Sequence, residues 1–444
     1  MLNARLSANV SRLREETGNS GDLVVRELSI PWAGPSGTQA AVVYLDGMAD
    51  AAGVQEFVIP SLLDRVPHPE AVRSRDLPDV LATSVLDAGG ITKIEQWGDG
   101  LHAVLSGNVL VLLDGERTAL EIDMPGYADR GIEETKTQTV VRGPQDAFTE
   151  TLIKNVSLVR RRIRDPRLRV VFQRKGTVTR TDICVLYMEG VASDELVRTL
   201  MTRLGQVDLR GVFDANYLEE FLSGRKFSLY PTVYNTERPD TLSAMLLEGR
   251  IAIIADGSPF ALAAPAVLMD FIQSAEDYYQ SPFFSNLIRL LRMLALLIAL
   301  LAPSAYIAIT TFHQDLLPTQ LLLSVAAQRE GVPFPAFIEA LTMEITFEIL
   351  REAGIRMPRT IGQAVSIVGT IVIGQAAVEA GIVSAAMVIV VAITAIASFA
   401  IPAYSLSLSV RLHRFFFMAM GATMGIYGLT VGLLISIMML SRLD

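Results

Sequence analysis

Cysteine and histidine are scarce in this chain of 444 residues, which has one Cys and four His. The single cysteine, Cys184, excludes an internal disulfide framework and a thiolate-rich zinc site. It lies in the apolar run ICVLY, so we expect a buried, inert thiol. The sequence also lacks a Walker loop, a GxSxG elbow and a dinucleotide-binding fingerprint. Because no nucleophile–base or metal constellation appears, we expect no enzyme, no cofactor and no metal site.

Charged residues are missing from long stretches of the C-terminal part. The first 282 residues hold 29 of the 38 Lys and Arg and 39 of the 47 Asp and Glu. A bilayer core needs roughly 20 apolar residues of helix. Four runs supply that length without any charged side chain, at 293–314, 360–378, 380–410 and 415–441. We therefore expect a soluble region followed by a multi-pass membrane domain.

The N-terminus lacks the features of a secretory signal peptide. Its first 20 residues, MLNARLSANVSRLREETGNS, are polar and amphipathic. We therefore expect the N-terminal region to stay in the cytoplasm. Its net charge is 29 − 39 = −10, whereas a nucleic-acid-binding domain favours a basic face. We expect no nucleic-acid partner.

Two sequence segments repeat in the same order within the soluble region. VVYLDGMA at 42–49 matches VLYMEGVA at 185–192, and LSGNVLVLLDG at 105–115 matches LEGRIAIIADG at 247–257, at offsets of 143 and 142. Each unit is expected to run strand, helix, strand. The sequence therefore predicts an α/β N-terminal region of two duplicated subdomains, 1–143 and 144–282, followed by an α-helical polytopic membrane domain, 283–444.

Details of these subdomains follow from turn chemistry. The closing strands end at Asp114 and Asp256, each followed by glycine, and we expect each Asp to bond its own backbone in a turn. Catalysis by these carboxylates is the weaker alternative. The first subdomain is expected to carry an inserted hairpin through Trp97, Gly98 and Gly100.

One basic cluster stands out in the soluble region. It comprises Arg160, Arg161, Arg162, Arg164, Arg167 and Arg169. We expect a solvated helix face that pairs with acids of a neighbouring element. Contact with anionic lipid headgroups is the alternative.

The membrane half contains one segment that is too broken for a simple span. Residues 316–350 include Pro318, Pro333 and Pro335, and proline interrupts helices. The excess of basic residues on cytoplasmic loops places Arg411 and Arg414 on the cytoplasmic side, between two spans.

Acidic residues follow one face of the helix predicted after Pro335. Glu344 and Glu348 are spaced i, i+4, and Arg351 falls on the same face. One interpretation is a membrane-surface helix whose acids pair with Arg351 and Arg356. The other is a ring of pore-mouth acids, Glu344 and Glu348, that concentrates cations.

The charge-free run 360–378 carries a stripe of small and polar residues. The candidate pore-lining residues are Gln363, Ser366, Ile367, Thr370, Ile371 and Gly374. Small polar residues at this spacing let membrane helices pack closely. In a symmetric oligomer the same stripe lines a narrow pore, with Ile367 and Ile371 as hydrophobic constrictions. Both interpretations stay open.

Several long motifs resemble those of a known family, the A subunits of the spore germinant receptors or GerA family. The motifs are GNSGDLVVRE at 18–27, RRRIRDPRL at 160–168, NTERPDTLSAMLLEGRIAIIADGSPF at 235–260, SAEDYYQSPFFSNLIRLLR at 274–292, MPRTIGQAVSIVGTIVIGQAAV at 357–378 and VAITAIASFAIPAY at 391–404. The resemblance spans nearly the whole chain in order.

The resemblance implies a multi-pass protein of the spore inner membrane that acts without enzymatic chemistry. Members are thought to form oligomeric, nutrient-gated ion channels, pentamers in current models, with a permease-like B subunit and a lipoprotein C subunit. We therefore expect a homo-oligomeric cation channel subunit in contact with membrane lipid. The alternatives are a secondary transporter and an accessory sporulation channel subunit.

Overall fold

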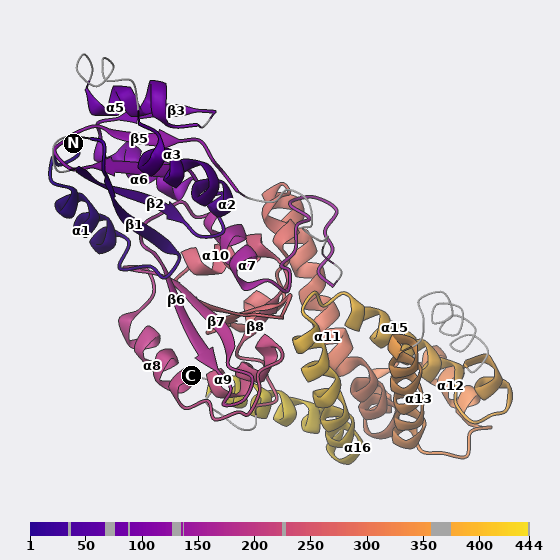
Figure 1. The fold of residues 1–444 in the computed structure, drawn as a ribbon. Helices are drawn as coiled ribbons and strands as arrows, with labels where there is room; N and C mark the ends of the chain where they lie inside the picture. Colours follow the sequence, from indigo (N-terminus) through magenta and orange to yellow (C-terminus); the bar gives the residue numbers. More distant parts are fainter. Residues whose placement is uncertain are drawn as a thin grey trace. The chain divides into compact units, whose positions relative to one another are not determined.

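The computed structural model describes residues 1–33, 37–66, 76–87, 89–126, 135, 137–223, 228–356 and 374–442. The chain divides into two compact units. The first, here the sheet unit, comprises residues 1–226 and 233–266. The second, here the helical unit, comprises residues 227–232 and 267–444. Figure 1 shows strands in the sheet unit and long helices in the other.

The sheet unit begins with a lobe built on a five-stranded antiparallel sheet of order β1-β2-β4-β5-β3. The strands are β1 Leu23–Ile30, β2 Thr38–Leu45, β3 Ile91–Ile94, β4 Val109–Leu113 and β5 Ala119–Ile122. The helices are α1 Leu6–Glu16, α2 Ala51–Gly53, α3 Ile59–Asp64, α5 Leu77–Val80 and α6 Trp97–Leu105, with π-helical turns at Val54–Val58 and Leu81–Val85.

A second lobe repeats this arrangement with the strand order β6-β7-β9-β10-β8. Its strands are β6 Leu168–Lys175, β7 Thr181–Met188, β8 Tyr234–Thr236, β9 Ile251–Ala255 and β10 Ala261–Ala264. Its helices are α7 Leu152–Arg160, α8 Asp194–Gly205, α9 Glu219–Ser223 and α10 Pro239–Leu247, with a 3-10 turn at Ala215–Leu218. The α/β class and the strands predicted around the repeated motifs are confirmed. The duplication also extends to the helices before each sheet.

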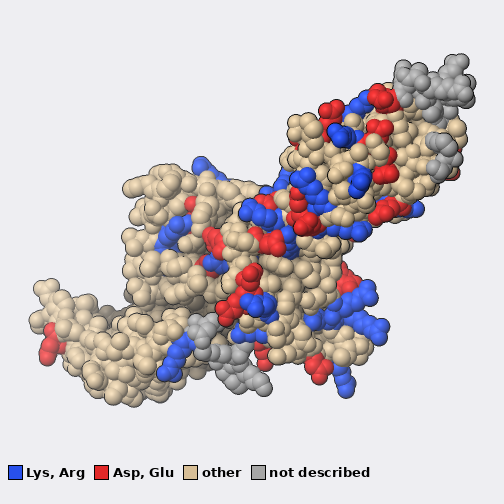
Figure 2. Space-filling model, turned by 90° about the vertical axis from the view of Figure 1, so that its left-hand side faces the viewer, with Lys and Arg blue, Asp and Glu red and all other residues tan. Residues whose placement is uncertain are grey.

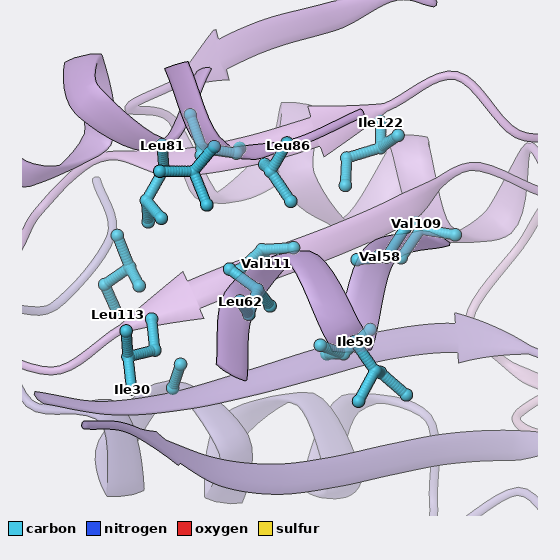
Figure 3. Packing of buried hydrophobic residues seen from close by; sticks show 14 of the residues in the cluster. Ile30, Val58, Ile59, Leu62, Leu81, Leu86, Val109, Val111, Leu113 and Ile122 are labelled. Carbon is cyan, nitrogen blue, oxygen red and sulfur yellow. The ribbon is translucent and has the colours of Figure 1, made fainter. Parts of the chain in front are cut away.

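Both faces of each sheet are covered, which explains the continuous apolar runs of the central strands. All five residues of β4 and all five of β9 are buried. In the first lobe, Val109, Val111 and Leu113 pack with residues of α3 on one face, while Leu110 and Leu112 pack with α1 and α6 on the other. Figure 3 shows side chains of the first of these clusters gathered on one face of the sheet, beside α3. Strands that are buried on both faces are apolar throughout and do not alternate between apolar and polar residues.

The Asp-Gly pairs at the ends of β4 and β9 serve the helix that begins each lobe. The Asp114 Oδ1 accepts the Leu6 amide at 2.9 Å, and the Asp256 Oδ1 accepts the Leu152 amide at 3.0 Å. These amides start α1 and α7, where no intrahelical acceptor exists. The following glycines, Gly115 and Gly257, have φ of 88° and 82° as predicted for the turns. The prediction that each Asp bonds its own turn was wrong, because the helix start competes for the same carboxylate.

The hairpin predicted through Trp97, Gly98 and Gly100 is wrong: these residues form the first turns of α6. The Trp97 indole donates to Glu16 Oε2 at 2.8 Å, and the Arg12 guanidinium lies 4.4 Å from the ring centroid. A Cβ at Gly100 would lie 3.4 Å from the Leu110 side chain. Tertiary contacts of the tryptophan therefore hold a helix where two glycines lower the local propensity.

A buried ion pair joins the two lobes of the sheet unit. The Arg160 Nε donates to Asp22 Oδ2 at 2.8 Å, and both side chains are at most 2% exposed. The Arg160 Nη2 donates to Asp22 Oδ1 and to the Ser20 hydroxyl, which itself donates to Asp22. The predicted pairing of the arginine cluster with acids is found at Arg162, which binds Asp146 at 2.6 Å. Arg160, however, is buried rather than part of a solvated face.

The helical unit follows from residue 267. Its helices are α11 Pro282–Phe312, α12 Thr319–Arg329, α13 Ala336–Arg356, α15 Ala385–Phe399 and α16 Tyr404–Leu440, with a helical segment at 374–379 and 3-10 turns at Leu268–Phe271, Ala275–Tyr278 and Gln314–Leu316. The helical unit begins before the predicted boundary at Pro282, because it takes in the turns that precede α11. The reason is that Asp277 binds Arg292 at 2.6 Å and Arg289 at 3.3 Å, both on α11.

Among the described residues, α11 and α16 are long and apolar enough to cross a membrane, judged by length and composition. The shorter α15 is also apolar. In Figure 2, charged residues of both signs are interspersed over one part of the surface, while another part is almost free of them. Large apolar side chains of α11 are exposed, among them Leu290, Leu291 and Leu294.

The last helix bends sharply back on itself at Gly425. This residue has φ 60° and ψ −142°, outside the helical region. Leu429 packs in one cluster with Phe417 and Ala308, and a Cβ at Gly432 would lie 2.9 Å from the Phe417 ring. Fifteen residues of straight helix would separate positions 417 and 432 by about 22 Å. The two arms of α16 therefore pack against each other.

Candidate functional site

The acids of α13 lie in a cluster of buried charges inside the helical unit. Glu344 receives a hydrogen bond from Arg414 Nη1 at 2.6 Å, and each side chain is 1% exposed. One turn later, Glu348 binds Arg411 Nη1 at 3.0 Å. The i, i+4 spacing of the acids on α13 thus meets the i, i+3 spacing of the arginines on α16.

A third arginine completes this charge cluster, defined by Glu344, Glu348, Arg351, Arg411 and Arg414. The Arg351 Nη1 lies 3.9 Å from Glu348, and its Nη2 donates to the Ser398 hydroxyl of α15 at 2.9 Å. Its guanidinium also lies 5.1 Å from the centroid of the Phe399 ring. Two carboxylates therefore face three guanidinium groups, which gives the cluster a net charge of +1.

Arg414 also repairs a gap in the hydrogen bonding of α11. Pro303 lies inside this helix and has no amide hydrogen, so it cannot bond the carbonyl four residues earlier. That carbonyl belongs to Ala299, and it accepts the Arg414 Nε at 2.8 Å. One guanidinium group therefore connects α11, α13 and α16.

The cluster is not fully hydrogen-bonded. Five of its buried side-chain atoms have no hydrogen-bond partner among the described residues: Glu344 Oε1, Glu348 Oε1, Arg351 Nε, Arg411 Nη2 and Arg414 Nη2. A buried polar group without a partner costs about 1–3 kcal/mol. Native proteins retain few such groups, so five of them in one cluster call for an explanation.

A second buried acid, Glu339, caps a helix. It is 0% exposed and accepts the Ser384 amide at 2.5 Å and the Ser384 hydroxyl. Ser384 is the residue before α15, so the carboxylate lies at the positive end of that helix. The Arg329 Nε lies 3.9 Å from its other oxygen.

The sequence predictions for these acids can now be placed in the structure. Glu348 contacts Arg351, and Glu352 binds Arg356 at 2.6 Å in an exposed pair, as the ion-pair interpretation predicted. The stronger partners, Arg411 and Arg414, were missed because they were assigned to a cytoplasmic loop, whereas they lie on the buried face of α16. Matching i, i+4 and i, i+3 spacings of opposite charges were the available signal. The pore-mouth role of Glu344 and Glu348 stays a prediction.

Most of the predicted pore-lining stripe lies outside the described residues, namely Gln363, Ser366, Ile367, Thr370 and Ile371. Gly374 is described, is buried and is helical. A Cβ at this position would lie 3.6 Å from the Val388 side chain of α15.

Cys184 lies in β7 and is 0% exposed. Burial raises the pKa of its thiol well above the usual value, because the thiolate would lose its hydration. The thiol is therefore protonated at neutral pH. Among the described residues, no group of three or more His, Cys, Asp and Glu is arranged to hold a metal ion.

Comparison with known proteins identifies the class of protein. The family model described as Bacillus/Clostridium GerA spore germination protein matches residues 11–444. The chain belongs to this family, which confirms the resemblance seen in its motifs.

Individual relatives cover nearly the whole chain. It is 44% identical to spore germination protein KA of Bacillus subtilis over 98% of this chain and 79% of that protein. It is 39% identical to the membrane protein YfkQ of Bacillus subtilis over 100% of this chain and 85% of the other. Spore germination protein GerLA of Bacillus cereus is 38% identical over 98% and 87%.

A solved structure also matches. The crystal structure of the N-terminal domain of the A subunit of the Bacillus megaterium spore germinant receptor GerK3 shares 31% identity with this chain. The match covers 60% of this chain and 97% of the solved chain, with a TM-score of 0.45.

Proposed function

We propose that this chain is a subunit of a nutrient-responsive, oligomeric membrane channel that triggers spore germination by releasing cations. The observation that carries the proposal is the charge cluster, which lies within a unit whose longest helices are apolar enough to span a bilayer. Ionisable residues within such helices are expensive and are typically kept for ion or proton pathways. Membership in a family of spore germination proteins supports the physiological role.

The proposed assembly follows the family. We place the protein in the spore inner membrane as a multi-pass homo-oligomer, a pentamer, with its sheet unit in the cytoplasm. Its partners are a permease-like B subunit, a lipoprotein C subunit and membrane lipid. We propose that the stripe of Gln363, Ser366 and Thr370 faces the oligomer axis, with Ile367 as the hydrophobic constriction that gates by dewetting, while Gly374 at its end packs against α15.

The purified full-length protein in planar bilayers tests the channel. Unitary current steps support a channel, whereas saturable slow flux without steps supports the alternative of a secondary transporter. Transporters commonly carry an inverted repeat of their membrane helices, whereas the repeat of this chain lies in the sheet unit. An accessory sporulation subunit predicts currents that do not change when the B subunit and nutrient are added.

The substitution Ile367→Ala tests the gate. Because a smaller side chain widens a dewetted constriction, we expect a constitutive cation leak, and premature ion release in spores. The matched control is Ile382→Ala, since Ile382 is an exposed isoleucine outside the stripe. A variant of Ile367 that assembles normally and stays as tight as the wild type assigns the stripe to helix packing.

A further inference from the structure

The charge cluster combines firm attachment with incomplete hydrogen bonding. Arg414 binds a carboxylate on α13 and a backbone carbonyl on α11, at 2.6 and 2.8 Å. Arg411 repeats the attachment to α13 at 3.0 Å. Moving α16 away from α13 therefore breaks both pairs together.

The unpartnered atoms would gain hydrogen bonds if the two helices moved apart. Three are guanidinium nitrogens and two are carboxylate oxygens, and all are buried without partners among the described residues. Each would be satisfied by water if the two helices separated. A purely structural ion pair gains most when every donor and acceptor is satisfied. The paired state of this cluster is thus held by its two ion pairs and weakened by its own orphan atoms.

The charge balance decides how the cluster acts on ions in the paired state. Glu344 and Glu348 are neutralised by Arg414 and Arg411, and Arg351 adds one further positive charge. A site with a net charge of +1 does not concentrate cations. The two acids become an attractive site only when their guanidinium partners move away.

We propose that Arg411 and Arg414 are positioning residues that determine both closure and cation selectivity: they hold Glu344 and Glu348 paired while the channel is closed and release them to face the ion path when it opens. This inference rests on the proposed channel function. It assigns the acids their pore-mouth role in the open state alone. It also makes the helix pair α13–α16 the element with two arrangements that a signal must bias.

Three variants of the full-length protein test the proposal in proteoliposomes loaded with potassium. Arg414→Gln breaks one pair and leaves Glu344 free. The double substitution Glu344→Gln with Arg414→Gln removes both charges. The reversal Glu344→Arg with Arg414→Glu restores the ion pair with opposite polarity but not the hydrogen bond to the Ala299 carbonyl, so it isolates the contribution of the pair. The matched control is Glu352→Gln with Arg356→Gln, which removes an exposed Glu–Arg pair from the same helix α13.

We expect Arg414→Gln to raise the resting potassium efflux about tenfold or more, which corresponds to about 1.4 kcal/mol in the closed–open equilibrium. The reversed pair should bring the efflux partway back to the wild-type value, because the hydrogen bond to the Ala299 carbonyl stays absent. The neutral double variant should leak like Arg414→Gln, but with lower preference for potassium over chloride at low salt, where screening is weakest. The control pair should change neither property.

Other outcomes overturn the proposal. If assembled Arg414→Gln protein stays tight, or if the reversed pair leaks as much as the single variant, the ion pairs do not hold the closed state. If Arg414→Gln fails to assemble, the neutral double variant decides: a tight neutral double variant likewise overturns the proposal. A leak in Ile367→Ala with none in any charge-cluster variant rejects this inference while the channel stands. Absence of current in every variant, Ile367→Ala included, rejects the channel itself.

Discussion

The sheet unit and the helical unit each bury an arginine–carboxylate pair, and the two pairs are completed differently. Arg160 donates through Nε and Nη2 to the two carboxylate oxygens of Asp22, and the Ser20 hydroxyl accepts from Arg160 and donates to Asp22. Neither residue has an unpartnered buried atom among the described residues. Glu344 and Arg414 share one hydrogen bond and leave one atom each without a partner.

This difference indicates that the Arg160–Asp22 pair holds its two lobes together permanently, whereas the Glu344–Arg414 pair can open. A fully satisfied buried pair gains no additional hydrogen bonds from opening, because its groups would only exchange protein partners for water. A partly satisfied pair regains hydrogen bonds when water enters. We therefore expect the two lobes of the sheet unit to move as one body and the α13–α16 pair to have two arrangements.

The largest effect is expected when the fully satisfied pair is broken. Asp22→Asn leaves the Arg160 charge buried without compensation, which should lower the free energy of unfolding of the sheet unit by about 3–5 kcal/mol. The measurement is urea denaturation of a fragment comprising residues 1–266, whose wild-type form we expect to be monodisperse and two-state. An insoluble wild-type fragment would contradict the division into two domains.

The exposed pair of Asp165 and Arg167, 2.7 Å apart, provides the control for that measurement. The Arg167 guanidinium lowers the pKa of Asp165 by hydrogen bonding. A lowered folded-state pKa stabilises the protein above the ordinary Asp value of about 3.9, and the contribution disappears as pH falls through the folded-state pKa. Asp165→Asn should therefore cost less than about 1 kcal/mol at pH 7 and progressively less in acid. If Asp22→Asn and Asp165→Asn lower the free energy of unfolding equally, the buried Arg160–Asp22 pair does not hold the two lobes together.

A smaller effect is expected in the helical unit at the reversal of α16. The backbone of Gly425 has φ 60° and ψ −142°, a region that is essentially restricted to glycine. A Cβ there would also lie 2.7 Å from the His313 ring. Gly425→Ala should destabilise the helical unit by about 1–3 kcal/mol, measured by thermal unfolding of the full-length protein in detergent.

Gly331→Ala is the matched control, because a Cβ at Gly331 has no atom within 4 Å among the described residues. An unchanged unfolding temperature for Gly425→Ala would show that the two arms of α16 do not need this conformation. The helical unit would then be more adaptable than its packing indicates.

The smallest effect sharpens the comparison inside the sheet unit. Asp114→Ala and Asp256→Ala each remove the side chain that accepts the first amide of α1 or α7. Each should cost about 1 kcal/mol, as the loss of a helix cap does, and the double variant should show additive costs. Asp208→Ala, at an exposed position, is the control for urea denaturation. If the two substitutions lower the free energy of unfolding by very different amounts, the equivalent hydrogen bonds of the two lobes do not contribute equally to stability.

Local pattern was enough to predict the strands and turns of the sheet unit. The apolar runs around Val42, Val185 and their partner strands are short and end in glycine-containing turns, which favours strands, and the glycines after Asp114 and Asp256 mark the turns. The family, too, could be read from contiguous motifs. These signals all lie within short segments of the chain.

The errors concern contacts between distant residues. Arg160 lies 138 residues from Asp22, and no local pattern indicates that the motif at 18–27 packs against the motif at 160–168. Arg411 and Arg414 were assigned to a loop because two positive charges interrupt an apolar run. The acids that neutralise them lie 63 and 70 residues earlier, so the helix continues through these positions. The prediction of a hairpin at the glycines of α6 was wrong for the same reason, because the contact that stabilises the helix there joins Trp97 to the distant Glu16.

Pro303 fixes the position of α16 along α11. A carbonyl whose amide partner is missing by covalent structure cannot be satisfied by any rearrangement within its own helix. Apart from Pro282 at its first position, Pro303 is the one proline of the described helix α11, so Ala299 is the one carbonyl there that proline leaves open in this way. A slide of α16 by a single turn would carry Arg414 about 5.4 Å away from it and would find no equivalent acceptor. If the helices separate and rejoin as we propose, this hydrogen bond returns them to the same alignment each time.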